Sequence, residues 1–160
     1  MPIVLLRIDD RLVHGQVVEG WLPHIQVDLV AVVSDAVASD EVQASLMKMA
    51  MPPSVGLLVL SVDAAAEALG APRTAGRRIL ILVPSPAEAL ALLKDGVAVP
   101  RVNVGGLHYT VGKVQLGRAL FLDEKDKDAL KEIAARGVRL EGRALPADPE
   151  ENLASILEGR

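Results

Sequence analysis

Ionisable side chains are concentrated in one short segment near the start of the sequence. Residues 7–16 read Arg-Ile-Asp-Asp-Arg-Leu-Val-His-Gly-Gln, so two arginines, two carboxylates and a histidine fall within a few positions of one another. The guanidinium group matches the geometry of phosphate oxygens, and a neutral imidazole nitrogen is a nucleophile near neutral pH. These residue types together predict a phosphate-binding site that contains a nucleophile, His14.

A purely structural interpretation of this segment stays open. The arginines could pair with the aspartates as an ion-pair cluster, and the ring of His14 could simply bond to a backbone carbonyl at a helix start. The other two histidines favour a structural role more strongly. His24 follows a proline in a turn, and His108 lies in a glycine-rich loop.

A second polar segment, residues 103–109, reads Asn-Val-Gly-Gly-Leu-His-Tyr and follows the fifth apolar run. Paired glycines allow a backbone to approach a ligand closely, so we expect a loop that shapes the rim of the same cleft. It is not a Walker A loop, because Lys113 is followed by Val114 rather than Ser or Thr. No G-x-G-x-x-G motif follows the first apolar run either, which disfavours a dinucleotide site.

Composition excludes several functional classes. The 160 residues carry 17 Lys and Arg against 21 Asp and Glu, with one Trp, one Tyr and one Phe, so nucleic acid is not the expected partner. The absence of cysteine excludes disulfides, thiolate metal sites and cysteine nucleophiles. No apolar run could span a bilayer or serve as a signal peptide. We therefore expect a cytoplasmic protein that uses no metal and no dissociable cofactor.

Short apolar runs alternate with segments of helical periodicity along the whole chain. The apolar runs are Ile3–Ile8, Val27–Val33, Val55–Leu60, Ile79–Val83, Val102–Val104 and the weaker Ala119–Leu122. Runs without polar alternation are typical of strands covered on both faces. The pattern predicts a single α/β domain over residues 1–160, an open, doubly wound, mainly parallel sheet with helices on both faces. Ligands bind such folds beyond the carboxyl ends of the strands.

The helical segments are marked by their apolar positions and by start and stop residues. They contain Val13, Val17 and Trp21 before Pro23; Val42, Leu46, Met49 and Ala50 before Pro52; Ala89, Leu90 and Leu93 between Ser85 and Gly96; Leu130, Ile133 and Ala134 between Asp123 and Gly137; and Leu153, Ile156 and Leu157 after Pro149. Asp35 could face the cleft, or it could cap the following helix together with Ser39 and Asp40. Residues 138–141 alternate, which predicts an edge strand with one wet face near the C-terminus. No exposed apolar stripe stands out, so no oligomeric state is predicted.

The functional segment also carries a family resemblance. Residues 7–17, with Trp21 shortly after, resemble the active-site signature of the mannose/fructose/sorbose-family enzyme IIB component of the bacterial phosphoenolpyruvate-dependent sugar phosphotransferase system. The similarity continues through residues 33–40, 103–106 and 137–146. The family's open α/β fold agrees with the alternation of elements described above.

The resemblance implies a phosphoryl carrier, a protein-Nπ-phosphohistidine:sugar phosphotransferase. By this likeness His14 accepts a phosphoryl group from a IIA component, at Nδ1, and passes it to a sugar that enters through membrane IIC and IID components. The protein would then be peripheral to the inner membrane through these partners. Arg7 and Arg11 are assigned to the phosphoryl oxygens. The identity of the sugar is not encoded in these motifs.

Other residues of the segment have expected roles that follow from their chemistry. The backbone N–H groups at Gly15 and Gln16 open a helix and favour an anion, so both residues join the predicted phosphate site. We expect Asp10, more than Asp9, to orient Arg11 or the ring of His14.

Two alternatives remain from the sequence. The chain could be a non-catalytic regulatory phosphorelay module, in which phosphorylation of His14 only changes a binding surface. It could also be a receiver-type domain, in which Asp9 and Asp10 bind Mg²⁺ and Asp63 accepts the phosphoryl group. Magnesium dependence of phosphorylation separates the second alternative from the histidine route.

Overall fold

Seven strands form the central sheet of the protein in a computed structural model, which describes residues 3–117 and 120–158. Their spatial order is β3 (Gly56–Leu60), β2 (Leu29–Val33), β4 (Ile79–Val83), β1 (Ile3–Asp9), β5 (Val102–Gly106), β8 (Leu140–Gly142) and β9 (Glu151–Asn152). Neighbouring strands are parallel except for the antiparallel pair β8 and β9. The predicted single-domain, mainly parallel α/β architecture is confirmed.

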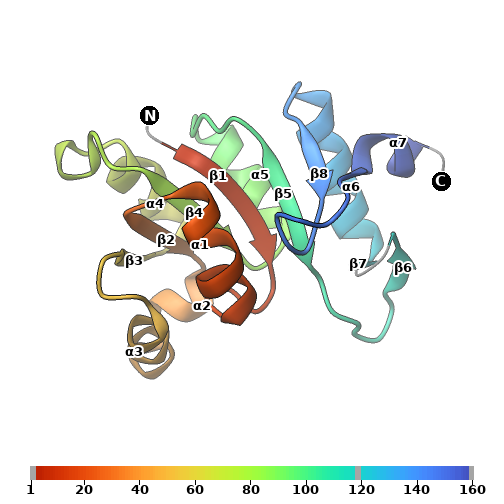
Figure 1. Cartoon of the computed structure of the whole chain (residues 1–160). Helices are drawn as coiled ribbons and strands as arrows, with labels where there is room; N and C mark the ends of the chain where they lie inside the picture. The colour runs from red at the N-terminus through yellow and green to blue at the C-terminus, as the bar shows by residue number, and fades with distance from the viewer. Residues whose placement is uncertain (1–2, 118–119, 159–160) are drawn as a thin grey trace.

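Helices cover both faces of the sheet (Figure 1). The π-helical turn η1 (Gln16–Trp21), α1 (Leu22–Ile25), α2 (Asp35–Ala38) and α3 (Glu41–Ala50) contribute side chains to one core cluster. The helices α4 (Val62–Leu69), α5 (Pro86–Lys94), α6 (Glu124–Ala135) and α7 (Leu153–Glu158) contribute to the other. A single 3₁₀ turn, η2 (Pro72–Thr74), follows α4. The sheet is therefore doubly wound, as predicted.

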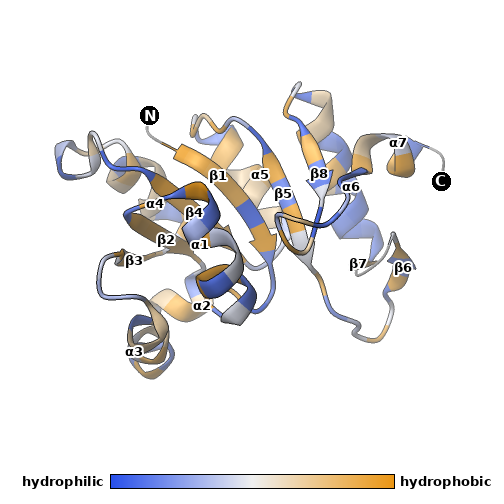
Figure 2. Cartoon of the chain, viewed as in Figure 1, coloured by the Kyte–Doolittle hydropathy of each residue, from blue (hydrophilic) through white to orange (hydrophobic). Residues whose placement is uncertain are grey.

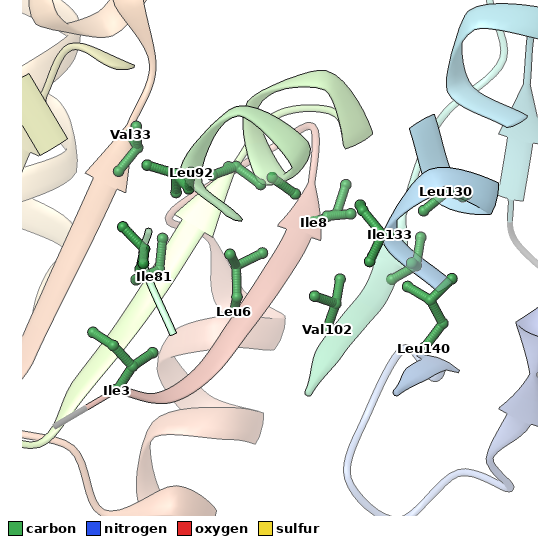
Figure 3. Close-up of a cluster of buried hydrophobic side chains, with 14 of the residues drawn as sticks. Ile3, Leu6, Ile8, Val33, Ile81, Leu92, Val102, Leu130, Ile133 and Leu140 are labelled. Carbon is green, nitrogen blue, oxygen red and sulfur yellow. The ribbon is translucent and has the colours of Figure 1, made fainter. Parts of the chain in front are cut away.

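The central strands are apolar on both sides because each side packs against helices. On β4, Leu80 and Leu82 belong to the cluster beneath η1 and α1, whereas Ile79, Ile81 and Val83 belong to the opposite cluster. Figure 3 shows this second cluster, where side chains of the sheet meet those of α5 and α6. This two-sided burial explains the absence of polar alternation in the apolar runs.

Polar residues interrupt the central strands at two neighbouring places. Figure 2 shows blue segments on β1 and β5 within otherwise orange strands. Arg7 on β1 is paired in register with Asn103 on β5, and both are fully buried. Asn103 to Gly106 therefore continue the strand β5, and the loop that we expected at this place begins only at Leu107.

A separate two-stranded antiparallel sheet lies beside the carboxyl end of β5. It consists of β6 (Val114–Leu116) and β7 (Leu120–Leu122). The weak apolar run that we expected to be a strand is thus β7, although it joins this small sheet rather than the central one; its first residue, Ala119, lies outside the described residues. The Phe121 N–H donates to the Leu107 carbonyl at 2.9 Å, which ties the small sheet to the end of β5.

The strand predicted near the C-terminus is displaced, and its wet face is wrong. The strand β8 lies between β5 and β9, and its three residues are all buried. Glu141 is accommodated there because Arg101 lies 3.1 Å and Arg143 lies 3.4 Å from its carboxylate oxygens. The antiparallel edge strand at this end of the sheet is β9.

Several helix boundaries differ from the sequence predictions. Pro23 does not end its helix, because it occupies the first turn of α1, where a missing N–H costs little. The last helix begins at Leu153 rather than at Pro149, and the helix α4 was not predicted at all. Ser85 precedes α5 without donating or accepting a capping bond to the backbone; its hydroxyl contacts Glu88 instead. Within residues 3–117 and 120–158, no helix is long and apolar enough to cross a bilayer.

The helix α3 carries an exposed apolar stripe that the sequence analysis did not anticipate. Val42, Leu46 and Met49 are 72%, 61% and 81% exposed, and Met47 is the residue of this helix that is buried in the core. Figure 1 shows α3 projecting beside the edge strand β3.

Candidate functional site

The predicted site lies at the carboxyl end of β1, between β4 and β5. After β1 the chain crosses to β2 on one side, and the connection from β4 to β5 later passes to the other side of β1. The strand order therefore reverses at β1, which is where open α/β sheets bind their ligands. Residues 10–15, the predicted functional loop, connect β1 to η1 at this point.

A buried ion pair closes the end of β1. Arg7 and Asp9 are both fully buried, and the Arg7 Nη2 donates to Asp9 Oδ2 at 3.0 Å. The Arg7 Nη1 donates to Asn103 Oδ1 at 2.6 Å and to the Arg143 carbonyl at 3.1 Å. Burial lowers the pKa of Arg7, and the adjacent Asp9 carboxylate opposes that shift. Residues two apart on a strand face the same side, which is why these two side chains meet.

The guanidinium of Arg7 is enclosed from several directions. Its Cζ atom lies 5.1 Å from the centroid of the Trp21 ring, which is itself fully buried. A Cβ atom placed on Gly105 would lie 2.0 Å from the same Cζ, so only glycine leaves room for the guanidinium. Arg7 therefore has no exposed surface with which to contact a phosphoryl group. The direct phosphate contact that we expected of Arg7 is incompatible with this position.

Asp9 connects the buried pair to the functional loop. Its Oδ1 accepts a hydrogen bond from the Arg11 backbone N–H at 3.0 Å and lies 3.7 Å from the Arg11 Nε. Its Oδ2 lies 3.5 Å from the His14 Nε2. Asp9 thus touches both the histidine and the exposed arginine of the loop.

Asp10 points elsewhere, which corrects the orienting role expected for it. Its Oδ2 accepts from the His108 backbone N–H at 2.7 Å, and its Oδ1 lies 2.6 Å from the His108 Nδ1. The physical reason is that β1 ends at Asp9, which faces the side of Arg7, and the chain turns at Asp10, whose backbone N–H donates to the Gly106 carbonyl at the end of β5. The position beside His14 and Arg11 is occupied by Asp9.

The ring of His14 is held at the edge of the site. Its side chain is 15% exposed, and its Nδ1 lies 2.8 Å from the Leu12 carbonyl oxygen. A carbonyl can only accept a hydrogen bond, so Nδ1 carries the proton in this arrangement. The Nε2 atom is buried and has no hydrogen-bond partner in the described part of the chain. Leu12 adopts a left-handed backbone conformation, φ 59°, which produces the turn that brings its carbonyl to the ring.

Three residues line the exposed side of this histidine, and we call them the rim: Arg11, Gly15 and Gln16. The Arg11 side chain is 43% exposed, and its Nη2 donates to Gln16 Oε1 at 2.9 Å. A Cβ placed on Gly15 would meet no atom within 4 Å, so space is open above this position. Within residues 3–117 and 120–158, the backbone N–H groups of Gly15 and Gln16 have no hydrogen-bond acceptor. The rim therefore offers one guanidinium and two N–H groups to an anion.

The remaining candidate residues lie away from His14 or have roles that differ from the expected ones. His24 is exposed on α1 and places its ring 6.5 Å from the Trp21 ring, edge to face. Asp35 accepts from the Val62 N–H at 2.8 Å, so it caps the start of α4 rather than the helix that follows it. Asp63 lies in the first turn of α4.

The geometry disfavours a receiver-type site. A pair of carboxylates that binds Mg²⁺ must converge on one point, with oxygen ligands about 2 Å from the ion. Asp9 and Asp10 instead face opposite directions, one toward Arg7 and the other toward His108. Within the two described stretches of the chain, no group of three or more His, Asp or Glu side chains is placed to hold a metal ion.

The sequence predicts residues 103–109 at the rim of the same cleft, but it assigns no contact in the site to Asn103, Gly105 or His108. Each belongs to β5 or directly follows it, and β5 pairs with β1 although the two strands are far apart in the chain. The alternation of apolar runs predicts a sheet without giving the strand order. Knowledge of the β1–β5 pairing would have indicated which residues of β1 they face, since Arg7 is paired with Asn103 and Asp9 with Gly106.

Comparison with known proteins identifies relatives over nearly the whole chain. The family described as "PTS system sorbose subfamily IIB component" matches residues 3–160. The mannose-specific EIIAB component of the phosphotransferase system (PTS) of Escherichia coli K12 is 39% identical over 98% of this chain, which spans 49% of that longer protein. The fructose-specific EIIB component of Bacillus subtilis is 36% identical over 98% of this chain and 96% of its own length.

Solved structures agree with this relationship. The IIB domain of the sorbose permease from Klebsiella pneumoniae superposes with a TM-score of 0.94 at 33% identity, covering 99% of this chain and 98% of that one. The N-acetylgalactosamine-specific IIB component 1 of Escherichia coli gives a TM-score of 0.86 at 33% identity, over 93% and 97% of the two chains. The chain therefore belongs to the sorbose subfamily of IIB components of the sugar phosphotransferase system.

Proposed function

We propose that His14 accepts a phosphoryl group from a IIA-type donor and passes it to a sugar handled by membrane IIC and IID components. The observation that carries the proposal is the position of His14, partly exposed at the carboxyl end of β1 beside Arg11 and Asp9. The mannose relative supports a IIA-type donor, because its name joins IIA and IIB in one protein of about twice this length. The protein would work at the cytoplasmic face of the membrane.

The transfer itself exchanges one P–N bond for another. The bond between phosphorus and the donor's histidine nitrogen breaks, that nitrogen recovers its electron pair, and a nitrogen of His14 forms a new bond to phosphorus. Such a transfer passes through a loose transition state with charge on the three equatorial oxygens. Arg11 and the free N–H groups of Gly15 and Gln16 are the groups of this chain that are placed to stabilise that charge.

The charge of Asp9 favours Nδ1 over Nε2 as the acceptor. A phosphoryl group on Nε2 would face the Asp9 carboxylate, whose oxygen lies 3.5 Å from that nitrogen, and like charges repel. Nδ1 becomes available when its hydrogen bond to the Leu12 carbonyl breaks and the proton is carried by Nε2 instead. The Nε2–H then donates a hydrogen bond to the Asp9 carboxylate, which orients the ring and stabilises the phosphorylated imidazole.

Arg7 contributes to this site indirectly. Its guanidinium holds Asp9 at 3.0 Å and balances the charge of that carboxylate within the protein interior. We therefore assign Arg7 as a positioning residue that acts through Asp9, and Arg11 as the phosphate-binding arginine.

The test is to incubate the purified chain with a ³²P-phosphorylated IIA-type donor and to map the label. We expect the label on His14, and none on the His14→Ala variant. The shift of the phosphohistidine in ³¹P NMR spectra distinguishes Nδ1 from Nε2. Label on Asp63, His24 or His108 with an unmodified His14 would contradict the assignment.

A second measurement separates the carrier from a regulatory module. Membranes that contain IIC and IID components are added to the phosphorylated chain together with candidate sugars. A carrier produces a labelled sugar phosphate and loses its own label at the same rate. A regulatory module keeps its label whichever sugar is present.

A further inference from the structure

The contact between Asp10 and His108 has no part in the proposed mechanism, although it lies directly beside the proposed site. Both oxygens of Asp10 are engaged by one residue: Oδ2 by the His108 backbone N–H at 2.7 Å and Oδ1 by the His108 Nδ1 at 2.6 Å. The Asp10 backbone N–H also donates to the Gly106 carbonyl at 3.0 Å. The functional loop after β1 is therefore fastened to the segment that follows β5.

His108 can hold Asp10 firmly because both of its chain neighbours are anchored. Leu107 is almost fully buried, and its carbonyl accepts from the Phe121 N–H of β7 at 2.9 Å. The ring of Tyr109 meets the ring of Phe121 edge to face, with centroids 5.8 Å apart. The small sheet formed by β6 and β7 thus supports the residue that binds Asp10.

The orientation of Asp10 matters because of its neighbour in the chain. Arg11 is the exposed guanidinium of the rim. If the carboxylate of the preceding residue, Asp10, were not held by another group, it would compete with a phosphoryl group for Arg11. The same carboxylate would repel the incoming negative charge. Among the described residues, the Asp10 carboxylate forms no hydrogen bond or ion pair with Arg11, because both of its oxygens face His108.

We propose that His108 is a positioning residue for phosphoryl transfer, which holds Asp10 away from Arg11 and keeps that arginine available to the phosphoryl group. This role rests on the proposed function of His14. It differs from general support of the loop, because the benefit arises from restraining one negative charge. The Asp10 carboxylate is harmful to transfer unless His108 binds it.

The experiment measures the rate at which phosphoramidate phosphorylates His14 in the full chain. In this reaction the P–N bond of phosphoramidate breaks, ammonia leaves and a P–N bond to His14 forms, so no protein donor is needed. We expect His108→Ala to slow the reaction about fivefold, since an exposed pair of this kind is worth up to about that factor. His108→Asn retains a donor at the position of Nδ1 and should keep a rate close to that of the unmodified chain.

The decisive variant is the double substitution His108→Ala with Asp10→Asn. Removing the negative charge should restore the rate to that of Asp10→Asn alone, because nothing then competes for Arg11. If His108 only supported the loop, the double variant would be at least as slow as His108→Ala. His24→Ala provides the matched control, since it removes an exposed histidine that lies away from the rim.

The outcomes separate this inference from the proposed function. If phosphoramidate leaves His14 unmodified in the unsubstituted chain, the function proposed for His14 is contradicted. If His14 is modified but His108→Ala reacts as fast as the unsubstituted chain, or Asp10→Asn fails to rescue it, the role of His108 is contradicted. Circular dichroism of each variant verifies that the fold is retained.

Discussion

The side chains of Arg7 and Asp9 place two charges in the interior at the end of β1. Removing a charge from water costs several kcal/mol even after relaxation, so a buried pair contributes little net stability. Here the arginine also bonds to Asn103 and to a backbone carbonyl, which offsets part of that cost. What the pair provides is a carboxylate of fixed direction beside His14. A preorganised group of this kind is needed when chemistry depends on one ring orientation.

The substitution Gly105→Ala tests whether this buried arrangement is required. A Cβ at this position would lie 2.0 Å from the Arg7 Cζ, so the guanidinium must leave its place and its partners. We expect a loss of about 3 kcal/mol or more in the free energy of unfolding, the usual cost of breaking a buried pair, together with loss of phosphorylation at His14. Urea denaturation measures the first effect and ³²P labelling the second.

Gly15→Ala is the matched control for stability, because a Cβ there meets open space on a helical backbone. We expect this variant to be as stable as the unsubstituted chain, or more stable by up to about 1 kcal/mol. Equal unfolding curves for Gly105→Ala and the unsubstituted chain would show that Arg7 can be rearranged at no cost.

The substitution Arg11→Lys tests the exposed guanidinium. Lysine keeps the charge but loses the planar fork that binds two oxygens at once, so phosphorylation of His14 should slow about tenfold. Stability should change by no more than about 0.5 kcal/mol, because the side chain is on the surface. The rate of labelling measures the first effect and urea denaturation the second, both on the same preparations. An unchanged labelling rate would remove Arg11 from the phosphate site.

At the residue scale, the sequence predicts which side chains gather at the candidate site but not where each one points. The clustering of ionisable groups marks His14, Arg11 and the acidic pair as candidates. Which aspartate faces the histidine depends on where β1 ends, because a strand alternates its side chains. That end lies at Asp9, so the orienting position belongs to Asp9 and not to Asp10.

At the scale of elements, burial on both faces makes the strands recognisable in the sequence. The order of the strands in the sheet depends on packing that cannot be read from the sequence. The apolar runs predict β1 to β5 because side chains of each strand join the helix-covered clusters, although those of the edge strand β3 are only partly buried. The pairing of β1 with β5 could not be predicted, since the periodicity of a strand says nothing about its neighbours. For the same reason Asn103 resembled a loop residue, although it is the buried partner of Arg7.

The helix α6 begins with a capping box, which gives a prediction at the scale of an element. The Asp123 carboxylate accepts from the Asp126 N–H at 2.8 Å, and the Asp126 carboxylate accepts from the Asp123 N–H at 3.2 Å. The bond from the Asp126 backbone is the main reason that the pKa of Asp123 lies below its usual 3.8. Asp123→Ala should lower the free energy of unfolding by about 1 kcal/mol at pH 7.

The sign of the pH effect follows from that depressed pKa. The folded protein holds Asp123 ionised more strongly than the unfolded chain does, so its contribution is present above the unfolded pKa and is lost as the pH falls through the folded one. The difference between Asp123→Ala and the unsubstituted chain should therefore shrink below about pH 4. Urea curves at pH 7 and pH 3 measure it, with Asp128→Ala, an exposed position of the same helix, as control. A difference that stays constant down to pH 3 would contradict the capping role.

The whole molecule presents the residues of the candidate site at one end, because parallel strands place all their carboxyl ends together. The rim and the Asp10–His108 contact share that end, whereas the helices that follow the strands return toward the opposite one. The formal net charge of the chain is −4, so the positive charge of Arg11 on this surface contrasts with the net negative charge of the protein. A partner that carries a phosphoryl group would meet the exposed Arg11 at the centre of its docking surface.

Binding of an unphosphorylated IIA-type donor tests this view of the surface. Transfer between two histidines requires a short-lived complex, so we expect weak affinity that falls as ionic strength rises. The substitution Arg11→Glu should weaken binding at least about tenfold at low salt and flatten its salt dependence, because reversal of a charge at an interface acts through long-range attraction. Arg73→Glu makes the same change of net charge on η2, close to the amino end of β4, and should bind as the unsubstituted chain does. Titration calorimetry over a range of salt concentrations measures both variants, and equal weakening by the two would mean that net charge, rather than the surface around His14, governs docking.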